Sequence, residues 1–373
     1  MNADYIVVGA GIAGASIAYW LSRHARVLML ERESQAGYHS TGRSAAVFIA
    51  SYGPPQVRAL SAASRDFLDH PPAGFCAHPL LTRREVLVFA RAGQEAMLDA
   101  YEALARSACG AVRRLDAAET LRRVPVLRPD ELIGAVLEPE ACDIDVDGLL
   151  QGFLRGMRAN GGQVVYDAGV HGLTRAQDAW LVRTSRGQYT APIVINAAGA
   201  WADQIGVLAG AAPLGLVPKR RSALLFDPPA DMRTEHWPMF ADIEQSFYVK
   251  PDAGLLLGSA LNEDPVEPHD VQAEELDIAI AIDAIQNMTT LTVRRPRHVW
   301  AGLRSFVDGG ELAGGFDRGI PGFFWAAAQG GYGIQTAPAA GMLFDAMLRR
   351  QPVPAALAAF GVNPALLDPA LLR

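Results

Sequence analysis

A glycine-rich segment near the N-terminus constrains the fold of this chain most strongly. The segment GAGIAG, at residues 9–14, follows an apolar run at 4–8 that is typical of a buried parallel strand. It opens a segment at 12–22 whose small and apolar residues favour a helix packed closely on a sheet. A second strand is expected at 26–31, and it ends in Glu31. Together, this strand, turn, helix and strand predict a dinucleotide site at the carboxyl end of the first strand.

Each glycine of the motif has a physical role in such a site. Gly9 allows the tight turn, Gly11 lets the backbone approach a pyrophosphate, and Gly14 allows the helix to pack closely. The N-terminus of the following helix attracts the phosphates. Glu31 can bind a pair of ribose hydroxyls and disfavours the 2′-phosphate of NADP. The motif alone leaves NAD and FAD open.

A second glycine turn favours FAD over NAD. The segment PIVINAAG, at 192–199, reads as an apolar strand that ends in a glycine-containing turn. Such a turn lies at the carboxyl edge of a parallel sheet, where ligands bind. NAD enzymes do not usually need a second turn of this kind, whereas the long, bent FAD crosses the sheet. An NAD-dependent reductase stays as an alternative.

Composition argues against several other classes of protein. The net charge of -7 lacks the basic excess of a nucleic-acid surface. No apolar run approaches the ~18 residues of a membrane span, so we expect no transmembrane segment, although peripheral contact with a membrane is compatible with this composition. Cys76, Cys109 and Cys142 are widely spaced, and the eight histidines form no ligand spacing. We therefore expect a cytoplasmic protein without a metal site.

The remaining patterns predict an α/β fold with two interleaved domains. Asp116 and Glu119 have the spacing of a capping box, and the region from 215 to 306 shows short strands and few helical periods. We expect a Rossmann-like, discontinuous dinucleotide-binding domain with an inserted, mostly antiparallel sheet domain for the substrate. Helices are expected at about 55–69, 94–108, 147–162 and 336–349. The expected boundaries are 1–48, 143–213 and 304–373 for the first domain and 49–142 and 214–303 for the second.

Several stretches along the chain carry a family resemblance. They are DYIVVGAGIAGASIAYWLS, GYHSTGRSAA, VINAAGAWAD, FYVKPDAG, WAGLRSF and AAQGGYGIQT. In combination they resemble the D-amino-acid oxidase superfamily of flavoenzymes, and within it the bacterial D-arginine dehydrogenases, which are relatives of glycine oxidase. The resemblance implies a glutathione-reductase-like architecture, noncovalently held FAD, and oxidation of a D-amino acid to an imino acid that hydrolyses to a 2-oxo acid and ammonia.

The resemblance also implies which residues contact the cofactor. Ser40, Thr41, Arg43 and Ser44 would bond to the pyrophosphate and the flavin ring, and an arginine fork suits phosphate oxygens. A surface turn or a plain loop is the alternative interpretation of these polar and glycine-rich segments. The full implied set is Gly9, Gly11, Ile12, Ala13, Gly14, Glu31, Arg32, Ser40, Thr41, Arg43, Ser44, Ala45, Ala46, Val170, Ala198, Gly199, Trp201, Arg304, Gly330, Gly331, Tyr332, Gly333, Ile334 and Gln335.

Four further matches point to the substrate. Arg304 and Arg221 match residues that bind the substrate, with Arg304 on the α-carboxylate, and a guanidinium fixes a carboxylate better than an ammonium does. Tyr52 and Tyr248 would donate hydrogen bonds and exclude water. No side chain is an obvious general base, and none is needed if the amine arrives unprotonated. The alternatives are a solvated charge run for Arg221, a buried ion pair for Arg304 and simple packing for Tyr52.

The departures from the D-arginine dehydrogenase pattern fall among the substrate contacts. Val47 and Ile49 stand in place of a histidine and a threonine, and Gln245 in place of a glutamate. Glu85 matches the acid that pairs with the guanidinium of the substrate, and the alternative interpretation is a surface carboxylate. Gly331 is the last of the substrate contacts that the resemblance implies. We therefore expect a shifted preference, either basic through Glu85 or apolar through Val47 and Ile49.

Three other functions stay open besides the NAD-dependent reductase. A flavoenzyme of this fold could act on a 2-hydroxy acid or on an N-methyl amino acid, and a noncatalytic flavin-binding module is also compatible with the motifs. The resemblance favours a quinone or another carrier over oxygen as the electron acceptor. The sequence leaves the oligomeric state open.

Overall fold

The GAGIAG motif joins a strand to a helix at the centre of a parallel sheet. The computed structural model describes residues 3–373, and β1 (Tyr5–Val8), α1 (Ile12–Leu21) and β2 (Val27–Leu30) form the expected unit. In the described chain this sheet has the order β20-β21-β13-β1-β2-β9, and β20 alone runs antiparallel to its neighbour. The other strands are β9 (Gln163–Val165), β13 (Ile193–Asn196), β20 (Ala313–Phe316) and β21 (Phe323–Ala327). β1 and β2 are apolar because helices and a second sheet cover their two faces.

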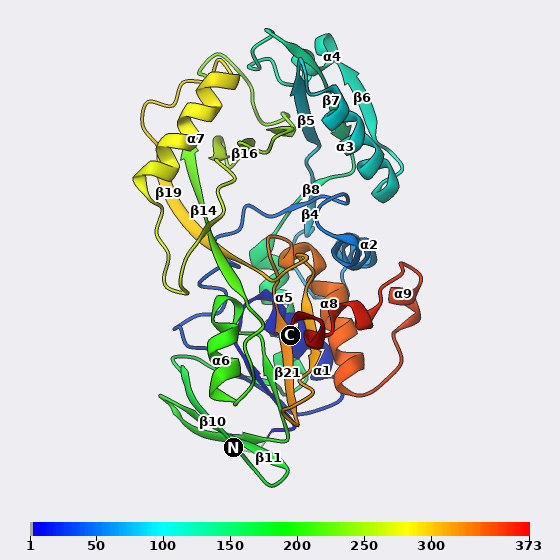
Figure 1. The fold of residues 1–373 in the computed structure, drawn as a ribbon, viewed down its shortest axis with the longest axis vertical. Helices are drawn as coiled ribbons and strands as arrows, with labels where there is room; N and C mark the ends of the chain where they lie inside the picture. The colour runs from blue at the N-terminus through cyan, green and yellow to red at the C-terminus, as the bar shows by residue number, and fades with distance from the viewer. Residues whose placement is uncertain (1–2) are drawn as a thin grey trace.

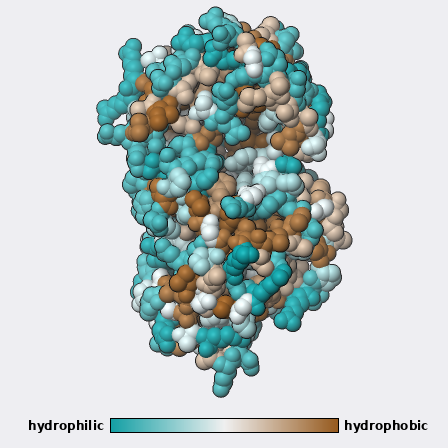
Figure 2. Space-filling view, in the orientation of Figure 1, coloured by the Kyte–Doolittle hydropathy of each residue, from teal (hydrophilic) through white to brown (hydrophobic). Residues whose placement is uncertain are grey.

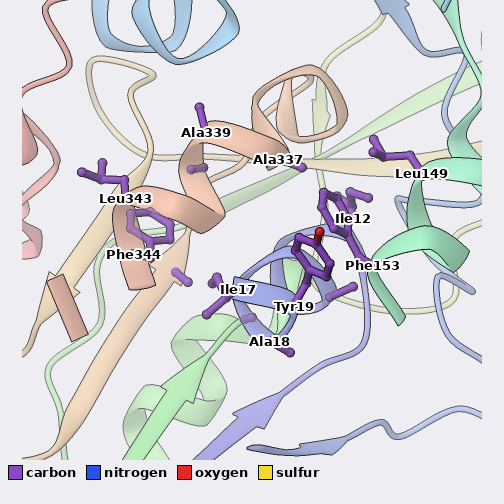
Figure 3. Close-up of a cluster of buried hydrophobic side chains, with 14 of the residues drawn as sticks. Ile12, Ile17, Ala18, Tyr19, Leu149, Phe153, Ala337, Ala339, Leu343 and Phe344 are labelled. Carbon is purple, nitrogen blue, oxygen red and sulfur yellow. The ribbon is translucent and has the colours of Figure 1, made fainter. Parts of the chain in front are cut away.

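Three helices pack together on one face of this sheet (Figure 1). They are α1, α5 (Val146–Ala159) and α8 (Gly333–Leu348). Figure 3 shows Ile17 and Tyr19 of α1 with Phe153 of α5 and Phe344 of α8 in one buried cluster. Tyr19 packs against Phe153 with ring centroids 5.4 Å apart. Most residues of α1 and α8 are buried, which agrees with the small and apolar residues of their sequences.

The helix α2 (Pro55–Asp69) departs from the expected domain boundaries. Its Val57 and Leu60 are fully buried in the cluster that α1 and α8 form. The expected substrate segment 49–142 therefore contributes a helix to the core of the dinucleotide-binding lobe. The boundaries elsewhere stay a prediction.

A small sheet and a short helix cover the opposite face of the parallel sheet. Trp180, on the middle strand of the small sheet, is buried against Phe323 of β21. These elements are β10 (Val170–Ala176), β11 (Ala179–Thr184), β12 (Gly187–Ala191), η1 (Gly199–Trp201) and α6 (Ala202–Leu208). The C-terminal segment adds α9 (Ala355–Ala358), η2 (Pro364–Leu367) and η3 (Pro369–Leu372).

The second lobe is built on a larger sheet, as expected. Within residues 3–373 its strand pairs are antiparallel apart from β5 with β15. Its strands are β5 (Val86–Arg91), β6 (Arg113–Asp116), β7 (Leu132–Glu138), β14 (Val217–Phe226), β15 (Met239–Asp242), β16 (Tyr248–Asp252), β17 (Leu255–Ser259), β18 (Asp264–Pro265) and β19 (His298–Phe306). Its helices are α3 (Glu95–Ala108), α4 (Ala117–Arg123) and α7 (Glu275–Met288). A smaller sheet joins β3 (Val47–Phe48), β4 (Leu81–Arg83) and β8 (Cys142–Ile144).

The predicted capping box at Asp116 and Glu119 is confirmed at the start of α4.

The helix α7 corrects the expectation of few helical periods between 215 and 306. Its sequence ELDIAIAIDAIQNM alternates isoleucine and alanine, which imitates the period of a strand. Its buried residues nevertheless follow helical spacing, at Asp277, Ala281 and Ile285. Asp277 accepts hydrogen bonds from Arg220 Nε at 2.7 Å and from Ser222 Oγ at 2.6 Å, which fastens the helix to β14.

Replacing Asp277 with asparagine should destabilise the fold by about 3 kcal/mol at pH 7, because Arg220 would lose a buried charged partner. Burial acts to raise the pKa of Asp277, but the hydrogen bonds from Arg220 and Ser222 outweigh burial and lower that pKa below 3.8. The ionic contribution is therefore complete above about pH 4 and is lost as the pH falls through the lowered pKa. Urea unfolding at pH 7 and pH 3 checks this. Asp283→Asn, at an exposed position of the same helix, should change the midpoint little. Equal losses in both variants would contradict the assignment.

Two long strands connect the lobes. β14 and β19 pair antiparallel from Val217 opposite Phe306 to Leu225 opposite His298, and they run between the two halves of the molecule in Figure 1. We call this pair the β14–β19 ribbon. In Figure 2 apolar residues gather in a band across the middle of the visible face, while hydrophilic residues dominate both ends.

Candidate functional site

A cavity of about 540 Å³ lies at the carboxyl edge of the parallel sheet. The turns after β1, β2 and β13 open into it, as expected for a dinucleotide site. Gly9 has φ +103°, and a Cβ at this position would lie 2.5 Å from the Ala197 carbonyl oxygen, so the two turns are in contact. The predicted cofactor residues that line this cavity are Gly9, Gly11, Ile12, Ala13, Glu31, Arg32, Ser40, Thr41, Val170, Ala198, Gly199, Trp201 and Gly330.

Glu31 is buried and held in a fixed orientation at the end of β2. Its Oε2 accepts a hydrogen bond from the Ala10 amide at 2.7 Å, and its Oε1 accepts one from the Glu33 amide at 3.0 Å. These bonds connect the acid to the glycine turn, so its carboxylate stands beside the cavity without an ionic partner of its own among the described residues. Ribose hydroxyls are suitable donors to its remaining lone pairs.

A second cavity, of about 90 Å³, adjoins the first. Both are lined by Ile12, Ser40, Thr41, Leu303, Gln329 and Gly330. The predicted residues that line the second cavity include Arg43, Ser44, Ala45, Tyr248, Arg221, Arg304, Gly331, Gly333 and Ile334. Gln329 Nε2 is buried without a hydrogen-bond partner in the described structure, although the side chain reaches both cavities. An unpaired buried donor at this junction fits a ligand with oxygen or nitrogen acceptors, such as the ring and linker of FAD.

Arg221 presents an unused donor at the second cavity. Its Nε donates to the Asn262 carbonyl at 2.7 Å, and its Nη2 lies 3.2 Å from Glu263 Oε1. Its Nη1 is buried and has no partner among residues 3–373. Burial and the neighbouring Arg304 lower the pKa of Arg221 to about 10. An anion in the cavity would relieve both effects, so this end of the cavity is suited to a carboxylate.

Arg304 completes the cationic end of the second cavity. Its Nη1 donates to Tyr52 Oη at 3.1 Å. A Cβ on Gly331 would lie 2.6 Å from Tyr52 Oη and 2.8 Å from Arg304 Nη1, so only a residue without a side chain leaves this pair in place. Tyr248 is buried, and burial raises the pKa of its phenol. The tyrosine therefore stays protonated and can donate a hydrogen bond into the cavity. The structure thus places Tyr248, Arg221 and Arg304 in the lining of the second cavity, and Tyr52, which lies outside the described lining, contacts Arg304.

Other predicted residues lie elsewhere. Glu85 is absent from the described lining of both cavities, because it forms ion pairs with Arg123 and, at 3.6 Å, with Arg83. Gln245 is exposed on the turn between β15 and β16, with φ +59°. Val47 and Ile49 pack against the apolar cluster beneath β5 and β7. These positions correct the expectation that all four residues face the substrate.

Some predicted cofactor residues also have other partners. The Arg43 guanidinium lines the second cavity but bonds to Asp270 and, at 2.7 Å, to the Val271 carbonyl, so it fastens two loops together and is not free for phosphate. Gln335 bonds to Ser61 Oγ at 2.7 Å within the core. Ala46, Gly14 and Tyr332 lie outside the described linings, with Gly14 packed against the Gly9 carbonyl and Tyr332 bonded to Gly310.

Three residues of the site are not predicted by the sequence motifs. Asn262 and Glu263 hold Arg221 from a short loop after β17, and Gln329 joins the two cavities. Asn262 is fixed in turn, since its Oδ1 accepts from the Ser222 amide at 3.0 Å. The sequence offers only one signal for these residues, which is the position of Gln329 directly before the predicted glycine segment.

Comparisons with known proteins identify the family of this chain. Residues 4–347 match the family model described as FAD dependent oxidoreductase, DAO. The chain belongs to this family. As a member of the DAO family it is an FAD-dependent oxidoreductase, which confirms the predicted fold class and cofactor. The narrower resemblance to D-arginine dehydrogenase and the role of each site residue stay predictions.

Individual relatives differ in what they act on. The chain is 27% identical over 225 residues to L-2-hydroxyglutarate dehydrogenase from Escherichia coli, a match that covers 56% of this chain and 50% of the relative. It therefore spans about half the length of that relative. Its fold is similar to that of glycine oxidase from Geobacillus kaustophilus, with a TM-score of 0.84, 20% identity and 98% of each chain covered. Iminodiacetate oxidase from Chelativorans sp. BNC1 gives a TM-score of 0.79 at 25% identity, over 95% of this chain and 98% of that chain.

No helix within residues 3–373 is both long enough and apolar enough to span a membrane.

Proposed function

We propose that this DAO-family protein oxidises a D-amino acid to the imino acid, which then hydrolyses to a 2-oxo acid and ammonia. The observation that carries the proposal is the Nη1 of Arg221, which is buried beside Arg304 and has no partner among residues 3–373, in the second cavity next to the larger one proposed for FAD. Two neighbouring guanidinium groups suit one substrate carboxylate, because the Nη1 of Arg221 and the guanidinium of Arg304 can each donate a charge-assisted hydrogen bond to it. This anchor would hold the α-carbon next to the cofactor.

The residues of the chain would position and desolvate the substrate. When bound, FAD accepts a hydride from the substrate at its N5 atom. Arg221 and Arg304 would fix the carboxylate, and the phenols of Tyr52 and Tyr248 would hydrogen-bond the substrate and exclude water. We propose that FAD is held noncovalently, since none of the chain's cysteines lines either cavity within the described residues.

The surroundings of the cavity favour an apolar side chain over a basic one. Glu85, the acid expected to bind a guanidinium, is paired with Arg123 and Arg83. The second cavity is lined by apolar residues at Ala223, Leu303 and Ile334, whereas Val47 and Ile49 lie outside its described lining. We therefore propose a preference for substrates such as D-methionine or D-phenylalanine over D-arginine, and a quinone or another carrier as electron acceptor.

A second candidate function is oxidation of a 2-hydroxy acid. The match to L-2-hydroxyglutarate dehydrogenase favours it, and the same arginine pair would hold the carboxylate of a hydroxy acid. N-substituted amino acids form a third group, because a 102-residue segment is 32% identical to mouse mitochondrial sarcosine dehydrogenase. The carboxylate anchor alone does not discriminate among the three, so the substrate must be tested directly.

An anaerobic absorbance measurement tests the proposal. We expect the flavin bands of the purified protein to bleach on addition of D-methionine or D-phenylalanine, and more slowly with D-arginine. L-Methionine is the matched control, because it has the same functional groups with the opposite configuration at the α-carbon. Bleaching by 2-hydroxyglutarate or sarcosine but by no D-amino acid would replace the proposal with the corresponding alternative. Flavin that none of these compounds bleaches would point to the noncatalytic flavin-binding module.

A further inference from the structure

A buried carboxylate that contacts the loop carrying Tyr52 has no part in the proposed chemistry. Glu138 stands at the end of β7 and is only 2% exposed. No lysine, arginine or histidine within residues 3–373 forms an ion pair with it. Burying an ionised carboxylate without a cation costs several kcal/mol, so a protein keeps such a group where its hydrogen bonds are needed.

Two hydroxyl groups converge on one oxygen of this carboxylate. Ser51 Oγ and Tyr101 Oη each donate a hydrogen bond to Glu138 Oε1 at 2.6 Å. Burial, and then the charge of Glu138, raises the pKa of Tyr101 well above its usual value. The phenol therefore stays protonated and remains a donor. Hydroxyl bonds to a carboxylate are short and strong, so Glu138 holds both partners firmly.

Ser51 connects this carboxylate to the substrate cavity. It is buried and directly precedes Tyr52, whose Oη accepts the hydrogen bond from Arg304. The backbone of Ile49 is held on the other side of the loop, where its amide donates to Gln335 Oε1 at 3.1 Å. Gly53 then takes φ +91° to begin the turn into α2. The segment 49–53 is thus fastened at Ile49 and at Ser51.

We propose that Glu138 is a positioning residue: through Ser51 it holds the segment 49–53 so that Tyr52 meets Arg304 at the carboxylate site. This role rests on the proposed function of that site. Tyr101 holds Glu138 from α3, so the second lobe sets the position of Tyr52, which contacts Arg304 of the second cavity. A displacement of about 1 Å at such a site can reduce the rate about 100-fold.

Alanine and glutamine variants of Glu138 test this role in the intact, FAD-loaded protein. For Glu138→Ala we expect a fall of between about 10-fold and 100-fold in the rate of anaerobic flavin reduction per bound FAD. Glu138→Gln should restore most of the rate, because its amide oxygen can accept both hydroxyl bonds. Glu140→Ala, which removes an exposed acid two residues away, is the matched control and should leave the rate unchanged.

Two further measurements separate positioning from a merely structural role. Ser51→Ala should reproduce the loss seen in Glu138→Ala, and the double variant should be no slower than the slower single variant, since both act through one contact. Binding of pyruvate, a nonreacting carboxylate, followed by the shift of the flavin spectrum, should weaken in the same variants. This readout needs no turnover, so it tests Glu138 even if the proposed substrates fail to reduce the flavin.

The proposal would be overturned by a Glu138→Ala variant that melts at a lower temperature but keeps the wild-type reduction rate per bound FAD and the wild-type affinity for pyruvate. Additive losses in the double variant would also overturn it, because Ser51 and Glu138 would then act independently.

Discussion

Replacing Arg221 with methionine should lower kcat/KM for the amino-acid substrate by between about 30-fold and a few thousand-fold. The range follows from the 2–5 kcal/mol lost when one partner of a buried charged pair is removed, at about 1.4 kcal/mol for each factor of ten. Methionine keeps the length and the apolar stem of the side chain, so the change isolates the guanidinium. Steady-state kinetics at pH 7 measure the effect.

Arg297→Met is the control for this variant. Arg297 is an exposed arginine that pairs with Asp227 away from both cavities, so its loss should change kcat/KM by less than about threefold. Wild-type kcat/KM in Arg221→Met, with FAD bound, would mean that the carboxylate binds elsewhere. Glu263→Gln is an informative companion, because it removes the charge that faces Arg221 Nη2 while leaving Nη1 in place.

Replacing Gly9 with alanine should weaken FAD binding by about 100-fold or more. The new Cβ would have to occupy a position 2.5 Å from the Ala197 carbonyl oxygen, with a backbone φ of +103° that favours glycine. Relieving that contact separates the two turns that open into the large cavity. The strain of about 1–3 kcal/mol adds to the lost cofactor contacts. The FAD content of the purified variant and titration of the apoprotein with FAD measure the effect.

Gly93→Ala separates the backbone effect from the collision at Gly9. Gly93 also has a positive φ, +88°, but a Cβ there would meet nothing within 4 Å. We expect a loss of about 1–2 kcal/mol in the free energy of unfolding and normal FAD content. Full FAD content in both variants would show that the contact between the two turns is not needed for cofactor binding.

The parts of the fold that sequence predicted well are those with short-range causes. The GAGIAG turn must follow a strand and open a helix, and the capping box at Asp116 involves residues three apart, so each can be recognised locally. The apolar strands of the parallel sheet were equally clear, because burial on both faces leaves uninterrupted apolar runs.

The parts that sequence could not predict depend on partners far along the chain. Glu85 was expected in the cavity, but Arg123 on α4 pairs with it, and no local pattern shows that contact. Arg43 was expected at the phosphate, but Asp270 lies within reach of its guanidinium. In sequence, Asn262 and Glu263 form an ordinary polar loop. Only the fold shows that they contact Arg221 of β14. Helix α7 was missed because its isoleucine–alanine alternation satisfies a strand period as well as a helix period.

The β14–β19 ribbon carries both arginines of the candidate site, whereas part of the remaining cavity lining lies on other segments. Arg221 and Arg304 both stand on the ribbon, where Arg221 pairs with Gly302 and Arg304 with Lys219. Other residues of the second cavity lining, such as Ala45 and Ile334, instead stand on other segments of the chain. Substitution of those residues can therefore alter which substrates are accepted while the arginine pair proposed to hold the carboxylate is preserved. Related proteins with this fold can in this way differ in substrate and keep the same pair of arginines for the carboxylate.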